Sequence, residues 1–377
     1  MKPIKDPVNL SLGDLISAHA GKLTRTTHRN SPWLKVFPPD EHFRSEVRFQ
    51  TLYDLLPGAY NVFAPDGIGT KVALIDAVCG HKNAAKDLVA MTAGDITRSG
   101  GLPIAFTNVL DVSTLGDNEN SPIFLAVKEL FNGLVEVAND LKFACIKGET
   151  AELSKCVSSP NSKALVKFNW AGVMIGVNHP DKEITGEDLS PGQVVIALKE
   201  NGFRSNGISA VRATMEKIFG ENWWNNKDVV EQIATPSVLY DRFLCWINGW
   251  ENVSNNYKPY IKPELICHLS GGSFKSKFFE DILKRKGLSA KLDNLWEPPY
   301  IVSDIARWSE KPDEWLYEKW SCGQGALAVV DPSDVNLFIK YAAQFNIQAK
   351  AAGVIEDRKN PELHIISKFS DKWFIYK

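Results

Sequence analysis

The chain has 377 residues, of which 44% are hydrophobic and 23% charged, and its formal net charge at pH 7 is −2. This composition excludes a mainly disordered chain, and the near balance of acidic and basic residues excludes nucleic acid as a main partner. No apolar stretch reaches the ~20 residues of a membrane-spanning helix, and the N-terminus lacks the apolar core of a secretory signal. We therefore expect a cytoplasmic protein with no membrane partner. Its six cysteines show no zinc-like spacing, which predicts free thiols.

Strands and helices alternate in the first half of the chain. Apolar runs bounded by glycine turns predict strands, and apolar residues at three- and four-residue steps predict helices. The expected strands are 61–64, 104–110, 143–146 and 170–177, and the expected helices are 84–99 and 123–141. Such alternation predicts an α/β domain over residues 56–180, with functional residues where strands end.

A polar, turn-rich stretch at 181–191 predicts a linker, and a second block of elements follows it. We expect strands at 194–198, 265–269 and 326–330, and helices from about Asn206, at 274–284 and at 333–345. Residues 181–377 therefore form a second expected α/β domain, and residues 1–55 an N-terminal extension.

Four carboxylates stand at or near expected element boundaries in the first domain: Asp66, Asp95, Asp111 and Glu149. Carboxylates brought close together repel one another unless a cation lies between them. Oxygen ligands of this kind suit Mg²⁺ that is bound through carboxylates and substrate phosphates. Each acid taken alone is better explained as a solvated loop residue or a helix cap, and only the four together favour a metal site.

The turn Asp66–Lys71 reads DGIGTK and follows an expected strand. Gly67 and Gly69 let backbone N–H groups approach a phosphate closely, and Lys71 adds a positive charge, so the pattern favours a nucleotide loop. The alternative is an ordinary tight hairpin. The chain has no GxxxxGK[ST] loop, and its one GxGxxA pattern, at 323–328, precedes a strand, which argues against dinucleotide binding.

Two glycine-containing turns precede expected helices in the second domain, at 201–207 and at 270–272. Helix N-termini attract anions through their free N–H groups, so each turn is a candidate phosphate site. Simple N-capping by Asn206 or Ser273 is the favoured alternative. His268 lies inside an apolar strand pattern, and there we expect a satisfied core histidine.

Seven motifs occur together in a recognisable order: DGIGTK (66–71), AGD (93–95), KGETAEL (147–153), FNWAGVMIGV (168–177), RSNGIS (204–209), HLSGGSF (268–274) and CGQGAL (322–327). With these motifs the chain resembles the aminoimidazole ribonucleotide synthetase family, also called phosphoribosylformylglycinamidine cyclo-ligase. The wider superfamily includes selenophosphate synthetase, thiamine-monophosphate kinase and the hydrogenase maturation dehydratase.

The resemblance implies a two-domain fold that uses ATP and Mg²⁺. Its N-terminal mixed-sheet domain forms a β-barrel shared across a homodimer, a C-terminal α/β domain follows, and ATP binds between the two. The implied metal ligands are Asp66, Asp95 and Glu149, and the implied catalytic residues are Lys71, Arg204 and Asp111. The implied ATP and phosphate-binding residues are Asp66, Gly67, Gly69, Thr70, Lys71, Gly148, Glu149, Thr150, Ser205, Asn206, Gly271 and Gly272.

The family reaction uses ATP to phosphorylate an amide oxygen of formylglycinamidine ribonucleotide. A nitrogen of the same substrate then attacks that carbon, which closes the imidazole ring and expels phosphate. This chain departs from the family pattern at several places. It has Arg204 where the family carries His, Gly94 where it carries Asn, and Ser273 in place of a third glycine, and it lacks the early glycine-rich loop. An arginine cannot shuttle a proton at neutral pH, but it can clamp a phosphate.

Two other functions remain open at this stage. The chain is either a divergent superfamily enzyme that uses ATP on another substrate, such as thiamine phosphate, or a catalytically silent nucleotide-binding protein. Selenophosphate synthesis is disfavoured because no cysteine precedes Cys79.

Overall fold

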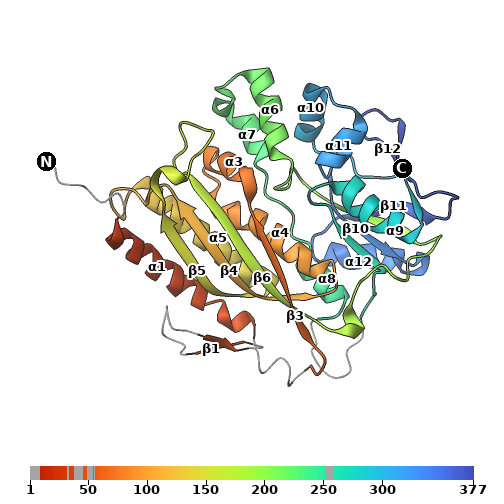
Figure 1. Ribbon diagram of the computed structural model, residues 1–377, viewed down its shortest axis with the longest axis horizontal. Coiled ribbons are helices and arrows are strands. Elements are labelled where there is room, and N and C mark those ends of the chain that lie inside the picture. Colours follow the sequence, from red (N-terminus) through yellow and green to blue (C-terminus); the bar gives the residue numbers. More distant parts are fainter. Residues whose placement is uncertain (1–8, 32–33, 38–45, 49–53, 55, 251–258) are drawn as a thin grey trace. The chain divides into compact units, whose positions relative to one another are not determined.

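The computed structural model describes residues 9–31, 34–37, 46–48, 54, 56–250 and 259–377 (Figure 1). The chain forms two compact units. The first contains residues 1–93 and 103–177, and the second contains residues 94–102 and 178–377. Residues 94–102 thus belong to the second unit, although they lie between two parts of the first unit in the sequence. The linear order of the elements does not indicate this.

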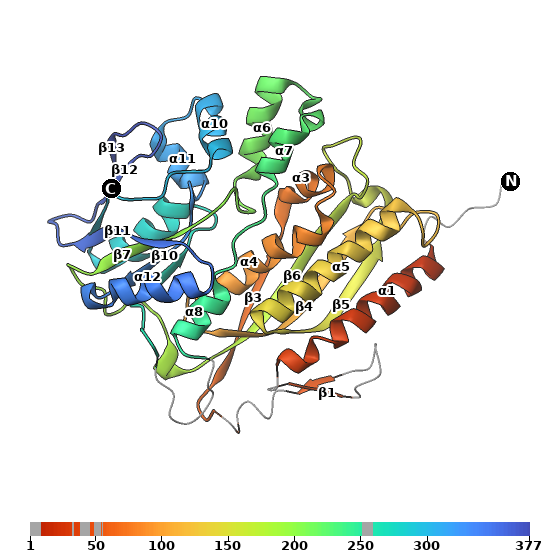
Figure 2. The same cartoon turned by 180° about the vertical axis from the view of Figure 1, so that it is seen from behind.

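A four-stranded sheet forms the centre of the first unit, with the strand order β3-β6-β4-β5. Figure 2 shows helix α5 (Pro122–Leu141) lying across one face of this sheet, with α1 (Leu10–Arg25) beside it. The Ser121 hydroxyl caps α5 by accepting a hydrogen bond from the Phe124 N–H. The strands are β3 (Tyr60–Gly67), β4 (Leu102–Val112), β5 (Ala144–Glu152) and β6 (Phe168–Asn178).

Strand β5 continues beyond the apolar residues that predicted it. It pairs in parallel with β4 as far as the Val112 and Glu152 positions, so residues 148–152 belong to a strand and the expected strand end near 146 is wrong. Lys147, Gly148 and Glu149 are exposed. The hydrophobic pattern therefore ends before these residues, whereas the backbone pairing with β4 continues through them. The remaining elements of this unit are β1 (Lys35–Phe37), β2 (Glu46–Arg48), α3 (Val72–Ala77) and most of α4 (Ala84–Thr97).

A seven-stranded sheet organises the second unit, with the order β13-β12-β9-β11-β7-β10-β8. Its central strands are almost continuously apolar and pack against helices on a core that includes Ile196, Phe243 and Phe338. The strands are β7 (Val194–Lys199), β8 (Leu265–His268), β9 (Ser289–Leu292), β10 (Gln324–Val330), β11 (Ala349–Glu356), β12 (Leu363–Ile366) and β13 (Trp373–Tyr376).

The helices of the second unit connect these strands. They are α6 (Ile208–Phe219), α7 (Lys227–Ile233), α8 (Asp241–Ile247), α9 (Lys284–Lys286), α10 (Tyr300–Ser309), α11 (Asp313–Lys319) and α12 (Val335–Gln344). The segment Phe274–Leu283, expected as an α-helix, is a π-helix that runs directly into α9. All six cysteines are free thiols, as their spacing predicts. Within the described ranges, no helix has the length and apolar character needed to cross a bilayer.

Candidate functional site

The DGIGTK turn joins the end of β3 to helix α3. Asp66 and Gly67 are the last residues of the strand, and the Asp66 carboxylate accepts a hydrogen bond from the Gly67 N–H at 2.7 Å. Gly69 has φ +63°, a conformation that other residues rarely adopt, and both Gly69 and Thr70 are exposed. The turn therefore presents backbone groups to its surroundings, as a phosphate-binding loop requires.

Lys71 points into the first unit. Its ammonium contacts the Asp87 carboxylate at 2.7 Å, and the two side chains are 0% and 1% exposed. Because a buried charge is tolerated only when it is paired, this ion pair anchors the turn to α4. A direct contact between Lys71 and a phosphate stays a prediction.

The four acids that the sequence predicts as a group stand on four different elements. Asp66 ends β3, Asp111 lies near the end of β4, and Glu149 lies within β5, whose ladder runs on past it. Asp95 lies on the last part of α4, which belongs to the second unit. Among the residues with described placement, no three His, Cys, Asp or Glu side chains form a group able to hold a metal ion. That the four carboxylates share one cation stays a prediction.

Gly148 and Thr150 flank Glu149 on β5. A Cβ atom at position 148 would lie 2.8 Å from the Asn108 amide, so this strand approaches β4 closely at a glycine. The Asn108 side chain in turn accepts a hydrogen bond from the indole of Trp170 at 3.0 Å. Asn108 and Trp170 were not singled out from the sequence, because each reads there as an ordinary strand residue.

A buried polar network lies at the ends of three neighbouring strands in the second unit. Arg204, which is 4% exposed, donates to the Glu200 carboxylate at 2.7 Å and contacts the His268 Nε2 atom at 2.8 Å. The Tyr240 hydroxyl donates to the Lys199 carbonyl at 2.7 Å and lies 3.3 Å from the same Glu200 carboxylate. This network holds the Arg204 side chain inside the unit.

Two glycines leave the space that the side chains of this network occupy. A Cβ atom at Gly325 would lie 2.3 Å from the Tyr240 hydroxyl and 2.7 Å from a Glu200 oxygen. A Cβ atom at Gly94 would lie 2.8 Å from the His268 ring. The sequence indicated neither Glu200 nor Tyr240, although Glu200 lies two residues after the expected strand 194–198, where functional residues are common.

Burial and charge shift the pKa values of three acid–base groups here. Burial, followed by the Arg204 guanidinium, lowers the pKa of His268 to about 4. Burial also raises the pKa of Asp241 to about 6, although this carboxylate accepts a hydrogen bond from the Thr97 hydroxyl. For Asp95 burial acts upward, but His268 and Arg98 together outweigh it and lower the pKa.

The two glycine turns of the second unit adjoin one another. The Asn206 side chain lies near Gly271, where an added Cβ atom would be 3.2 Å away, and Ser205 is buried. Gly207, not Asn206, caps α6, and no side chain caps either helix. The Ser273 hydroxyl donates instead to the Trp320 carbonyl at 3.1 Å. The favoured N-cap interpretation is therefore wrong, and Asn206 and Gly271 remain together as predicted binding residues, with Gly272 next in the chain.

Comparison with known proteins supports the resemblance. Residues 50–176 match the family described as AIR synthase related protein, N-terminal domain. The chain is 28% identical to the phosphoribosylformylglycinamidine cyclo-ligase of Methanocaldococcus jannaschii over 306 residues, which is 79% of each chain. It is also 28% identical to the enzyme of that name from Caldanaerobacter subterraneus over 305 residues, 78% of this chain and 82% of the relative.

Solved structures show the same fold at low sequence identity. Thiamine-monophosphate kinase from Stenotrophomonas maltophilia matches with a TM-score of 0.59 at 10% identity, over 91% of this chain and 94% of that one. HypE, a hydrogenase maturation protein from E. coli, matches with a TM-score of 0.58 at 12% identity, over 94% and 95%. Together with the motifs and their order, these findings show that the chain resembles the AIR synthase related proteins and the cyclo-ligases, as a divergent relative.

Proposed function

We propose that the chain is an ATP-dependent cyclo-ligase that acts in the cytoplasm, in purine biosynthesis, on formylglycinamidine ribonucleotide or a related amide. The observation that carries this proposal is the alignment with cyclo-ligases over 79% of both chains. Phosphorylation of the amide oxygen by ATP creates a leaving group, and a nitrogen of the same substrate then closes the ring. An enzyme accelerates such a step mainly by holding the two reacting ends together.

The exposed turn after β3 supports ATP binding in this proposal. Gly67, Gly69 and Thr70 offer backbone N–H groups to phosphate oxygens, and Lys71 holds the turn in place through its buried pair with Asp87. In the second unit we assign phosphate contacts to Ser205, Asn206, Gly271 and Gly272. Asp111, half-buried on β4, stays a weaker catalytic candidate.

Magnesium belongs to the proposal as the partner of ATP. We assign its protein ligands to Asp66, Asp95 and Glu149. The described side chains do not assemble a complete metal site by themselves. Mg²⁺ is commonly held by only one or two carboxylates together with water and substrate phosphates, so a site that the nucleotide completes is consistent with this geometry.

The test is substrate-dependent release of phosphate from ATP. We expect release that requires formylglycinamidine ribonucleotide, and we expect Asp66→Asn to abolish Mg²⁺-dependent ATP binding in calorimetry while the circular dichroism spectrum stays unchanged. Asp117→Asn, at an exposed position, is the matched control and should bind ATP normally. Release that does not need the ribonucleotide, or unchanged affinity in Asp66→Asn, contradicts the proposal.

A second candidate function is ATP-dependent chemistry on a different small substrate. The observation that favours it is the placement of Arg204, which is tied to Glu200 and His268 and leaves no imidazole at the position where the family carries one. Phosphate release with another substrate, such as thiamine monophosphate, and none with formylglycinamidine ribonucleotide would select this alternative.

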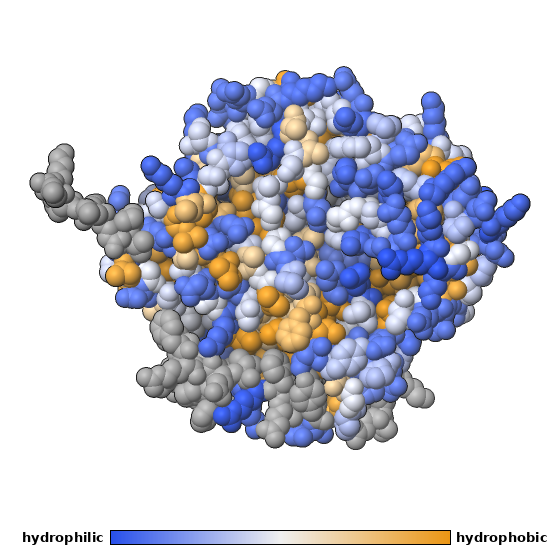
Figure 3. All heavy atoms as spheres, in the orientation of Figure 1, coloured by the Kyte–Doolittle hydropathy of each residue, from blue (hydrophilic) through white to orange (hydrophobic). Residues whose placement is uncertain are grey.

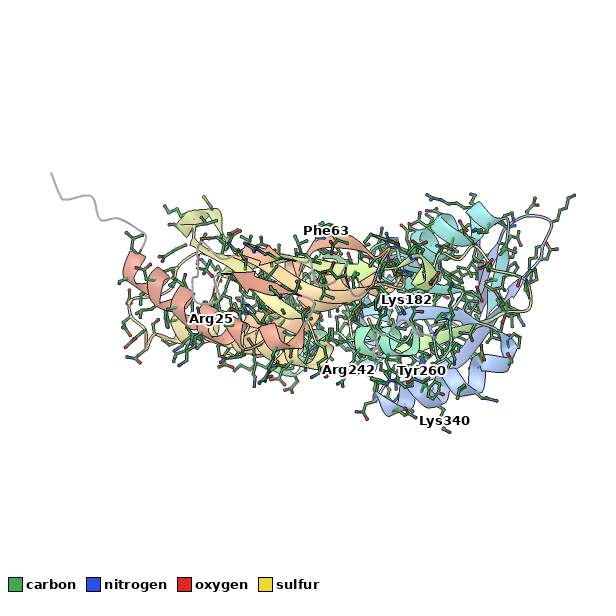
Figure 4. The ribbon with its side chains drawn as sticks, turned by 90° about the horizontal axis from the view of Figure 1, so that it is seen from below. Arg25, Phe63, Lys182, Arg242, Tyr260 and Lys340 are labelled. Carbon is green, nitrogen blue, oxygen red and sulfur yellow. The ribbon has the colours of Figure 1, made fainter. Side chains whose placement is uncertain are left out.

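We also infer a homodimer formed through the face of the four-stranded sheet that lies opposite helices α1 and α5. Phe63 on β3 and Val109 on β4 are 63% and 47% exposed, and Figure 3 shows apolar atoms gathered over these strands. Figure 4 shows Phe63 on the side of the sheet away from α1. Such a surface usually marks an interaction site. We expect sedimentation equilibrium to give a dimer that Phe63→Asp weakens at least tenfold, and a monomeric wild-type chain at micromolar concentration would contradict it.

A further inference from the structure

The chemistry of Arg204 and His268 determines which of them donates the hydrogen bond between them. His268 ends β8 and is 5% exposed, and its Nε2 atom lies 2.8 Å from an Arg204 terminal nitrogen. A guanidinium group has five N–H donors, no acceptor, and keeps its charge at all physiological pH values. The Nε2 atom must therefore accept this hydrogen bond and carry no proton. In the neutral ring the single proton then resides on Nδ1.

Further hydrogen bonds hold the Arg204 side chain in this position. Its other terminal nitrogen donates to Glu200 at 2.7 Å and to the Val238 carbonyl at 3.3 Å. Glu200 also accepts hydrogen bonds from the N–H groups of Asn201 and Val238, so the carboxylate that holds the guanidinium is itself fixed to the backbone. The orientation of the donor toward His268 is therefore built into the loop that follows β7.

The opposite edge of the ring is incomplete. Among the described residues, the buried Nδ1 atom has no hydrogen-bond partner, and the nearest Asp95 oxygen lies 3.8 Å away, beyond hydrogen-bond range. The same Asp95 oxygen contacts Arg98 at 3.0 Å. A buried N–H group without an acceptor is energetically costly, so a site that keeps one is suited to a ligand that supplies the acceptor.

The backbone beside the ring is shaped for this arrangement. Gly94 precedes Asp95, and a side chain at position 94 would meet the Nδ1 edge of the imidazole at 2.8 Å. The absence of a side chain there keeps the Nδ1 edge, which lies next to Asp95, clear of a Cβ atom. Arg204 thus contacts the Nε2 edge of the His268 ring, and Gly94 lies beside its Nδ1 edge.

We propose that Arg204 is a positioning residue that fixes His268 in the Nδ1–H tautomer, so that the ring donates a hydrogen bond beside Asp95 to an oxygen of the bound ligand. His268 then acts as a hydrogen-bond donor and not as a proton acceptor. Only the identity of that oxygen, on ATP or on the ribonucleotide, rests on the proposed function. The tautomer is a property of the chain alone.

The test is long-range ¹H–¹⁵N correlation NMR of protein labelled with ¹⁵N-histidine. The chain has seven histidines, and His268→Gln identifies the signal of interest. We expect His268 to show a protonated Nδ1 and an unprotonated Nε2, and the Nδ1 signal to shift when ATP or formylglycinamidine ribonucleotide is added. A protonated Nε2 in the wild-type chain overturns the proposal, and a Nδ1 signal that neither compound moves overturns its ligand-binding part. Neither result depends on turnover, so a failure of the cyclo-ligase assignment remains distinguishable.

Variants separate positioning from a merely structural role. Arg204→Met combined with Glu200→Gln removes the donor without leaving a buried carboxylate alone, and we expect the proton of His268 to redistribute toward Nε2. Arg204→Lys keeps a donor and should retain the Nδ1–H tautomer. Arg307→Met, which changes an exposed arginine on α10, is the matched control and should leave the His268 signals unchanged. A folded double variant with an unaltered tautomer contradicts the role of Arg204, and the wild-type spectrum decides the tautomer even if the variant does not fold.

Discussion

We expect Asp87→Leu to lower the free energy of unfolding by about 3–5 kcal/mol, because it removes the carboxylate that forms an ion pair with the buried Lys71 ammonium. The two groups are 2.7 Å apart and almost completely excluded from solvent. An ammonium that loses a paired carboxylate in such a place keeps the cost of its burial without that compensation. Urea unfolding followed by circular dichroism measures the change.

The double variant Lys71→Met/Asp87→Leu is the informative control. It removes both charges at once, so we expect it to recover most of the lost stability. Asp117→Leu, at an exposed position, should change stability by less than about 0.5 kcal/mol. If the double variant is no more stable than Asp87→Leu, the loss of stability does not come from the broken ion pair. If the restored double variant still turns over ATP, Lys71 supports the turn and does not contact the phosphate.

The second large effect concerns pH. We expect His268 to make the protein less stable by about 3 kcal/mol as the pH falls from 6.5 to 4. Its pKa of about 4 in the folded chain lies below the value near 6.5 of an unfolded histidine. Between these values the unfolded chain binds more protons, so stability decreases toward acid. Unfolding of the wild type and of His268→Gln across this range gives the difference.

Asp241 acts in the opposite direction over part of the same range. Its pKa of about 6 lies above that of an unfolded aspartate, so the folded chain binds the extra proton and stability decreases as the pH rises from about 4 to 6. Measuring the His268 effect in an Asp241→Asn background removes this opposing contribution. If His268→Gln has the same pH profile as its parent in that background, the histidine is not held neutral by its surroundings.

The sequence predicted the elements whose signals are local. Helix α5 was expected at 123–141 and runs over Pro122–Leu141, because an apolar stripe and the Ser-Pro start lie within one short window. Strand β7 was expected at 194–198 and ends one residue later, because a buried central strand is apolar along its whole length. The order of the motifs also predicted the resemblance that the comparisons support.

Features that depend on contacts distant in sequence were not predicted. Lys71 meets a carboxylate sixteen residues away, and nothing in DGIGTK shows that this lysine points inward. The extension of β5 depends on its partner strand and not on its own polar residues. The network around Arg204 joins residues from loops and strands far apart in the chain, so spacing within any one motif cannot reveal it.

The close approach of Gly94 to His268 couples two positions that lie 174 residues apart. A methyl group at position 94 and an imidazole at position 268 compete for the same space, and Arg204 keeps the ring from turning aside. Mutations at the two positions are therefore non-additive, since a smaller residue at 268 removes the cost of a larger one at 94. In this chain a side chain at 94 therefore requires the imidazole at 268 to shift or to be replaced by a smaller group.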